Sequence, residues 1–213
     1  MRFSADLGIL WSSRARSLMC VTRIRRNGSG AGYQVRATLA TMMAGPGRGS
    51  WFVPDPGDEL VAAFEAGDPR RPYVLGALWN GRDNPPESMD GAGSNDIRMF
   101  RSRSGHQIRM EDVAGSEKIV IRTPGGQTVT LADGPASMEI ADSSGNTVTL
   151  DSSGITVSAS AKVTITAASA EITASTLTVN AGMSTFSGVV KADTVITNSV
   201  VSAAYSPGAG NIC

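Results

Sequence analysis

The stretch that decides the fold runs from Gln127 to Ala181 and reads QTVTLADGPASMEIADSSGNTVTLDSSGITVSASAKVTITAASAEITASTLTVNA. Pairs of apolar residues two positions apart recur in it every seven to ten residues, and the residue between them is usually threonine. Such alternation puts aliphatic side chains on one face of a strand and threonines on the other. The pattern predicts short β-strands at Val129/Leu131, Met138/Ile140, Val148/Leu150, Ile155/Val157, Val163/Ile165, Ala170/Ile172 and Leu177/Val179.

A single chain cannot bury these pairs. Each strand offers two aliphatic side chains, and large residues to close a core are scarce after Phe100. Solenoids wound from one chain need longer coils, typically ~20 residues or more per turn. Three copies wound around one axis would bury the pairs against each other and leave few exposed strand edges. We therefore expect an obligate trimer whose core contains Val129, Leu131, Val148, Leu150, Ile155, Val157, Val163, Ile165, Leu177 and Val179.

The front of the chain has a different composition. Aromatic residues make up only 5% of the 213 residues, and all three tryptophans lie before Phe100. Turns rich in Gly, Pro and Asp separate short apolar segments, which indicates a small all-β barrel or sandwich. The expected strands are Tyr33–Met42, Ser50–Val53, Glu59–Glu65 and Tyr73–Trp79, and further pairs at Ile97/Met99, Ile108/Met110 and Ile119/Ile121 predict three strands leading into the rod.

Charge and cysteine usage exclude several function classes. The net charge is zero, and the early arginines fit a solvated face or a protein-binding arm better than nucleic-acid binding. Cys20 and Cys213 lie near opposite ends of the chain, which gives neither a metal site nor a disulfide framework. We expect no transmembrane segment, because no apolar run approaches ~18 residues. We also expect no signal peptide, since Met1–Leu10 carries Arg2 and Asp6.

Residues 49–81, GSWFVPDPGDELVAAFEAGDPRRPYVLGALWNG, carry a long motif of glycine, proline and acidic residues. This segment resembles the OB-fold domain of the VgrG and phage baseplate-spike family, and Ser104–Ile108 with Glu111-Asp112 resembles the segment that follows that domain. The ending Tyr205–Asn211 is similar to the C-termini of spikes from phage tails and extracellular contractile injection systems. Residues 1–31 show no matching first strand, and we expect this chain to lack the larger hub domain that precedes the OB domain in VgrG.

The resemblance implies three regions: an OB-fold domain at 1–86, a linker and first shaft strands at 87–126, and a triple-stranded β-helix (β-prism) shaft with its tip at 127–213. It implies a homotrimeric, cell-puncturing spike at the centre of a contractile baseplate, assembled in the bacterial cytoplasm and acting outside at the target cell. Expected partners are a hub or adaptor, the inner tube, transiently the target membrane, and a PAAR-repeat tip protein, which we expect to contact Tyr205, Pro207, Gly208 and Asn211. The alternative is a trimeric tail fibre or adhesin with a β-prism stalk.

Catalytic chemistry finds little support in the residues. His106 is the only histidine, so one chain cannot form a triad or a histidine-rich metal site. Asp55, Asp58 and Glu59 lie in or next to a turn, where carboxylates commonly accept turn hydrogen bonds. No phosphate-binding G-x-x-x-x-G-K-[ST] loop occurs, and the interval between Trp79 and Ile97 leaves no room for a lysozyme domain. We expect no enzyme activity, no cofactor, no metal and no bound nucleic acid.

Overall fold

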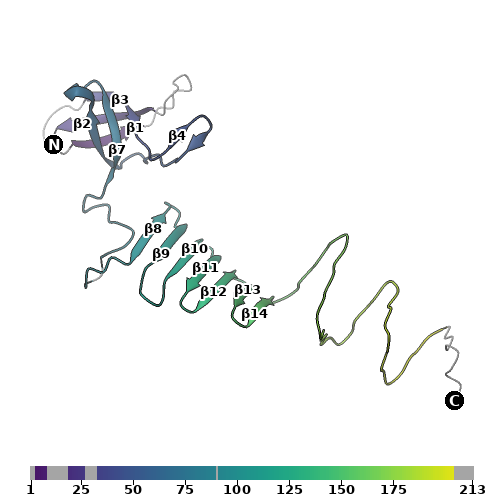
Figure 1. The fold of residues 1–213 in the computed structure, drawn as a ribbon. Coiled ribbons are helices and arrows are strands. Elements are labelled where there is room, and N and C mark those ends of the chain that lie inside the picture. The colour runs from purple at the N-terminus through teal and green to yellow at the C-terminus, as the bar shows by residue number, and fades with distance from the viewer. Residues whose placement is uncertain (1–2, 9–18, 27–32, 90, 204–213) are drawn as a thin grey trace, which may run out of the picture. The chain divides into compact units, whose positions relative to one another are not determined.

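The described part of the protein is built from β-strands. The computed structural model describes residues 3–8, 19–26, 33–89 and 91–203, and Figure 1 shows strands β1 to β14 along them. No α-helix occurs among these residues, and the one helical element is the 3-10 turn Glu65–Gly67. The expectation of an all-β chain is confirmed.

The first sheet has five strands in the order β1-β2-β3-β7-β6. All neighbours pair antiparallel except β3 and β7, which run parallel. Strand β1 also lies against β6, so the two edges of the sheet approach each other as in a small barrel. The strands are β1 (Phe3–Gly8), β2 (Met19–Arg26), β3 (Tyr33–Leu39), β6 (Glu59–Phe64) and β7 (Pro72–Leu78).

Apolar residues of three strands form the core of this barrel. Ala37, Leu60 and Val74 are almost fully buried, and Leu39 packs against them. The pairing of β6 with β7 jumps from Val61–Gly76 to Ala62–Val74. Leu75 therefore has no opposite residue in β6; it forms a β-bulge, and its side chain is 56% exposed.

The expected strand at Ser50–Val53 is wrong. The chain instead forms a small hairpin from β4 (Ala44–Gly45) and β5 (Arg48–Gly49), and residues 50–53 are irregular. The hydroxyl of Thr41 donates a hydrogen bond to the carbonyl of Ser50 at 2.9 Å and closes the base of this hairpin. The glycines and proline of the hairpin favour a tight reversal over a longer strand.

The second sheet is an antiparallel meander of seven strands in sequence order. Its strands are β8 (Ile97–Arg101), β9 (Gln107–Glu111), β10 (Lys118–Arg122), β11 (Thr128–Asp133), β12 (Ala136–Ala141), β13 (Thr147–Asp151) and β14 (Gly154–Ser158). The turns between strands use glycines with positive φ, such as Gly126 and Gly145, a conformation that other residues rarely adopt. Asp142 also accepts backbone N–H groups from Ser144 and Asn146 at 2.8 and 2.9 Å.

The chain forms no further strand after Ser158 among the residues described. Val163 to Ala203 is extended, and every one of these residues is exposed. The apolar pairs recur every seven to ten residues, so strands built on them could pair within one chain only through tight turns. No glycine, which favours such turns, occurs between Gly154 and Gly182. The aliphatic pattern found in β11 to β14 therefore continues into a segment that has no partner strand in its own chain. We call Val163–Ala203 the distal segment.

Replacing Leu60 by alanine tests the barrel core. Because Leu60 is 1% exposed, Leu60→Ala is expected to lower the free energy of unfolding of the first domain by ~2–5 kcal/mol. Urea unfolding followed by tryptophan fluorescence measures this loss. The neighbouring Val61 is 37% exposed, so Val61→Ala should cost clearly less; equal losses would contradict the assignment of the core.

Candidate functional site: an assembly interface

The register of the seven-stranded sheet aligns its apolar residues into two continuous rows. In antiparallel sheets, directly opposite residues point to the same face. One row consists of Phe100, Ile108, Ile121, Val129, Ile140, Val148 and Val157. The other consists of Met110, Ile119, Leu131, Met138, Leu150 and Ile155. We call this side of the sheet the apolar face.

Apart from Phe52, which stacks on Phe100, nothing in the described part of the chain covers the apolar face. Ile140 is 49% exposed, and exposure rises to 72% at Ile155 in the last strand. Monomeric proteins rarely expose large contiguous apolar patches, and those that occur usually mark an interaction surface. A sheet also needs a packed hydrophobic face for independent stability. The apolar face therefore needs a second layer from another chain.

The opposite face of the sheet is mostly polar. Threonines alternate with the aliphatic residues of β11, β13 and β14. Glu111 forms ion pairs with Arg109 at 2.8 Å and with Lys118 at 3.2 Å. The guanidinium of Arg109 also donates a hydrogen bond at 2.8 Å to Glu87, which precedes the sheet in the chain. The linker thus contacts the polar face and leaves the apolar face uncovered.

The structure brings six of the expected core residues together on the apolar face: Val129, Leu131, Val148, Leu150, Ile155 and Val157. The other four, Val163, Ile165, Leu177 and Val179, are exposed in the distal segment. That all ten surround a common axis stays a prediction. The tip residues Tyr205, Pro207, Gly208 and Asn211 lie outside the described residues.

The apolar face begins earlier than the selected core residues suggest. Phe100 opposite Ile108 starts one row, whereas Ile97 and Met99 lie on the other face, opposite Glu111 and Arg109. The pair Ile97/Met99 has the same period as the later pairs but the opposite phase. Only the register between strands shows that Ile97 and Met99 lie on the other face, because the spacing of apolar residues along one strand does not determine which face of the sheet they occupy.

Residues considered for chemistry have structural roles in the part of the chain described. His106 closes the turn between β8 and β9: its backbone N–H donates to the hydroxyl of Ser102, and its carbonyl accepts the N–H of Ser102 at 2.9 Å. The carboxylate of Asp58 accepts the N–H of Asp55 at 2.8 Å. The described residues contain no group of three or more His, Cys, Asp or Glu that could hold a metal ion.

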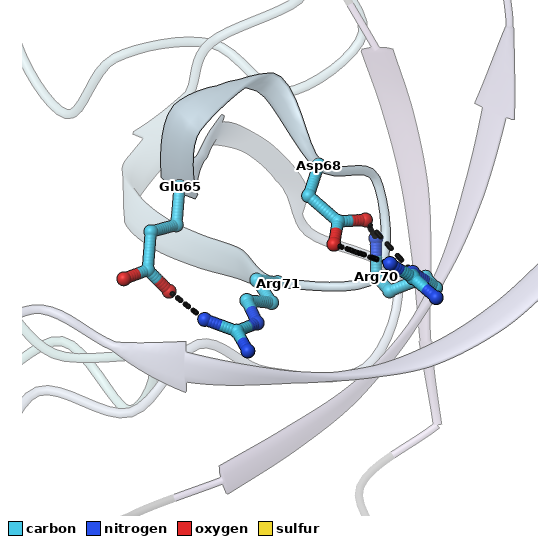
Figure 2. Close-up of polar contacts among 4 residues, drawn as sticks. All are labelled: Glu65, Asp68, Arg70 and Arg71. Atoms are coloured by element: carbon cyan, nitrogen blue, oxygen red, sulfur yellow. Dashed lines mark hydrogen bonds and ion pairs between the residues drawn. The ribbon is translucent and has the colours of Figure 1, made fainter.

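Two separate ion pairs lie at the turn between β6 and β7 in the first domain (Figure 2). The guanidinium of Arg70 donates hydrogen bonds to both carboxylate oxygens of Asp68, and Arg71 pairs with Glu65 at 3.3 Å. The side-chain hydrogen bond from Arg70, with another from its backbone N–H, holds the pKa of Asp68 below its ordinary value of 3.8. Positive φ at Ala66 and Gly67 completes this tight reversal.

Two protein-family models match the chain in the two regions just described. The type VI secretion system/phage-baseplate injector OB domain matches residues 21–79, and the phage baseplate V C-terminal trimerisation domain matches residues 118–185. The chain belongs to the VgrG and phage baseplate V family of spike proteins. The expected OB domain is therefore confirmed, and the trimerisation domain begins within the sheet and extends into the distal segment. Together they fit the expected β-prism.

Curated relatives are type VI secretion system spike proteins. VgrG1a of Pseudomonas aeruginosa is 31% identical over 101 residues, which are 45% of this chain and 16% of the relative. VgrG1b of the same organism is 30% identical over 92 residues, or 40% of this chain and 12% of the relative. VgrG3 of Vibrio cholerae is 27% identical over 86 residues, 39% of this chain and 8% of the relative. The matched segment thus spans less than a fifth of each of these relatives.

No helix in the described part of the chain could span a membrane.

The ion pair between Asp68 and Arg70 in Figure 2 predicts a pH-dependent contribution to the stability of the first domain. Because the folded-state pKa of Asp68 is lowered, its contribution is present above about 3.8 and is lost as the pH falls through the lower folded value. Asp68→Asn should therefore slightly lower the melting temperature at neutral pH, with a difference that shrinks in acid. Thermal unfolding monitored by circular dichroism over a pH series measures it. In an Arg70→Met background the pH-dependent difference should shrink, because the side-chain hydrogen bond is lost while the backbone one remains; an undiminished difference would contradict the role of the Arg70 side chain.

Proposed function

We propose that this protein is the homotrimeric central spike of a contractile injection machine, which pierces the target envelope when the sheath contracts. The observation that carries the proposal is an aliphatic pattern that continues, without an intrachain partner, from the apolar face into the distal segment. The trimerisation-domain match at 118–185 spans both parts, and the curated relatives are spike proteins.

The proposed trimer combines two kinds of contact between copies: packing of sheet faces and pairing of distal segments. Three seven-stranded sheets turn their apolar faces toward one axis and bury them against each other. Beyond Ser158 the distal segments of three copies pair with each other, because each lacks a partner strand within its chain. The core then includes the exposed aliphatics Val163, Ile165, Leu177 and Val179. Backbone hydrogen bonds between copies satisfy groups that are unpaired in one chain.

Such a shaft suits a mechanical function. Chains wound around each other cannot separate without breaking many backbone hydrogen bonds together, so the rod resists load during puncture. The mechanism needs no catalytic group, and we infer that the chain is structural rather than enzymatic. The described residues offer turn-forming histidine and carboxylates instead of a reaction site.

The partners follow from the two ends of this proposed spike. A PAAR-type tip protein caps the C-terminal end at Tyr205, Pro207, Gly208 and Asn211, while a hub or adaptor and the inner tube bind behind the OB domains. The spike is assembled in the bacterial cytoplasm into a phage tail or tail-like particle. It acts outside the producing cell and touches the target membrane transiently.

Purified protein is expected to be a trimer that resists SDS at room temperature, because dissociation requires the concerted loss of interchain strand pairs. Sedimentation gives the mass, and gel electrophoresis of boiled and unboiled samples gives the SDS resistance. Heating should convert the trimer band into a monomer band. A well-folded monomer by sedimentation would overturn the proposed function.

A pair of adjacent substitutions tests which face of the sheet is buried in the trimer. Ile155 and Thr156 are both exposed in the single chain and point to opposite faces of β14. Ile155→Asp should abolish or strongly weaken trimer formation, because three unpaired charges would be buried near the axis. Thr156→Asp should assemble like the parent. Sedimentation of both variants measures the effect, and the reverse order would show that the threonine face is inside.

A further inference from the structure

A second apolar surface lies on the OB domain, away from its core. A groove of about 560 Å³ is bordered by the β4–β5 hairpin region on one side and β7 on the other. Among its lining residues, Met42 is 84% exposed, Phe52 66% and Leu75 56%. Leu75 faces outward at the β-bulge of β7, where a regular strand would have given it an opposite partner in β6.

The chemistry of the groove selects an apolar ligand. No charged side chain occurs among the residues that line it. Its two hydroxyl groups, on Thr41 and Ser50, hydrogen-bond to each other, and Thr41 also donates to the carbonyl of Ser50. Val53, Pro54 and Ala77 add further apolar lining. The groove therefore has little to offer a polar small molecule and is suited to the apolar side chains of a protein.

The groove is continuous with the apolar face of the sheet. Phe52 stacks on Phe100 with ring centroids 5.8 Å apart and planes 18° from parallel. Phe100 is the first residue of the row that runs through Ile108 to Val157. An ion pair of 3.3 Å between Asp55 and Arg103 also joins the segment after Phe52 to the turn after β8. Phe100 is still 53% exposed after this stacking.

We propose that this OB groove is filled by a second copy of the chain, so that the OB domains form part of the trimer interface. The inference rests on the proposed trimer. The sheet surface that the proposed trimer buries is connected to the groove by the stacked rings of Phe100 and Phe52. In a three-fold ring each contact joins two different patches, so a hollow on one copy meets a raised apolar patch on the next.

This contact has a structural consequence for the spike. A neighbour seated in the groove packs against Phe52, which is stacked on the first strand of the sheet. The interface then ties each OB domain to an adjacent copy as well as to its own sheet. The three OB domains would then form one unit, and each would be connected to the rest of the spike by more than the segment at residues 79–96.

Photo-cross-linking of the full chain, purified without any other baseplate protein, tests the proposal. The photoreactive residue p-benzoylphenylalanine replaces Leu75 in one variant and Met42 in a second, because the high exposure of Met42 lets it tolerate the larger group. The control carries it at Tyr73, which is 39% exposed on the same strand but does not line the groove. Sedimentation first establishes that each variant is a trimer.

After illumination and boiling in SDS, the Leu75 or Met42 variant should give covalent dimers and trimers, severalfold more than the Tyr73 control. Peptide mapping should place the cross-link on the OB domain or first sheet strands of a second copy. If the trimers give no intermolecular product from either groove position, the inference is overturned, and a hub protein becomes the better candidate for binding the groove. Equal yields from the control would also overturn it. A monomeric parent chain would instead overturn the proposed function.

Discussion

An apolar sheet face that one chain cannot cover governs the rest of this structure. The meander β8–β14 pairs its strands within one chain except along the outer edges of β8 and β14, so its folding problem is mainly the burial of side chains. Two unbroken rows of apolar residues lie on one side, while threonines and the Arg109–Glu111–Lys118 ion pairs occupy the other. Association through the apolar rows is the arrangement that removes this surface from water, at roughly 25 cal/mol for each Å² buried.

Turn chemistry divides the trimerisation region into two parts with the same strand pattern. Up to Gly154, most reversals have a glycine with positive φ or an aspartate that accepts neighbouring N–H groups, and the chain folds back on itself. After that point alanine and serine replace them, and the same alternation of aliphatic residues and threonine runs on without a hairpin. Identical strand preferences thus lead to pairing within a chain or between chains, depending on the residues that separate the strands.

Much of this could be predicted from the sequence because it depends on local rules. Alternation located β11 to β14, and the Gly-Asp-Pro turn beside Arg70 located the β6–β7 reversal. The strand expected at Ser50–Val53 failed because the glycines of the β4–β5 hairpin shift pairing to Arg48–Gly49. The opposite phase of Ile97/Met99 and the outward bulge of Leu75 were not predictable, since both depend on register between strands. The groove, likewise, is assembled from distant segments joined only in the fold.

The distal segment also has a consequence for biosynthesis. The OB domain and the meander emerge from the ribosome first and can complete their strand pairing one chain at a time. Val163–Ala203 follows as an extended, aliphatic-rich ribbon that forms no strand in the described part of the chain. Until three copies meet, this ribbon is open to proteases and to mispairing with other nascent chains. The order of synthesis lets the domains that pair their strands within one chain bring three chains together before the distal segment has to find its register.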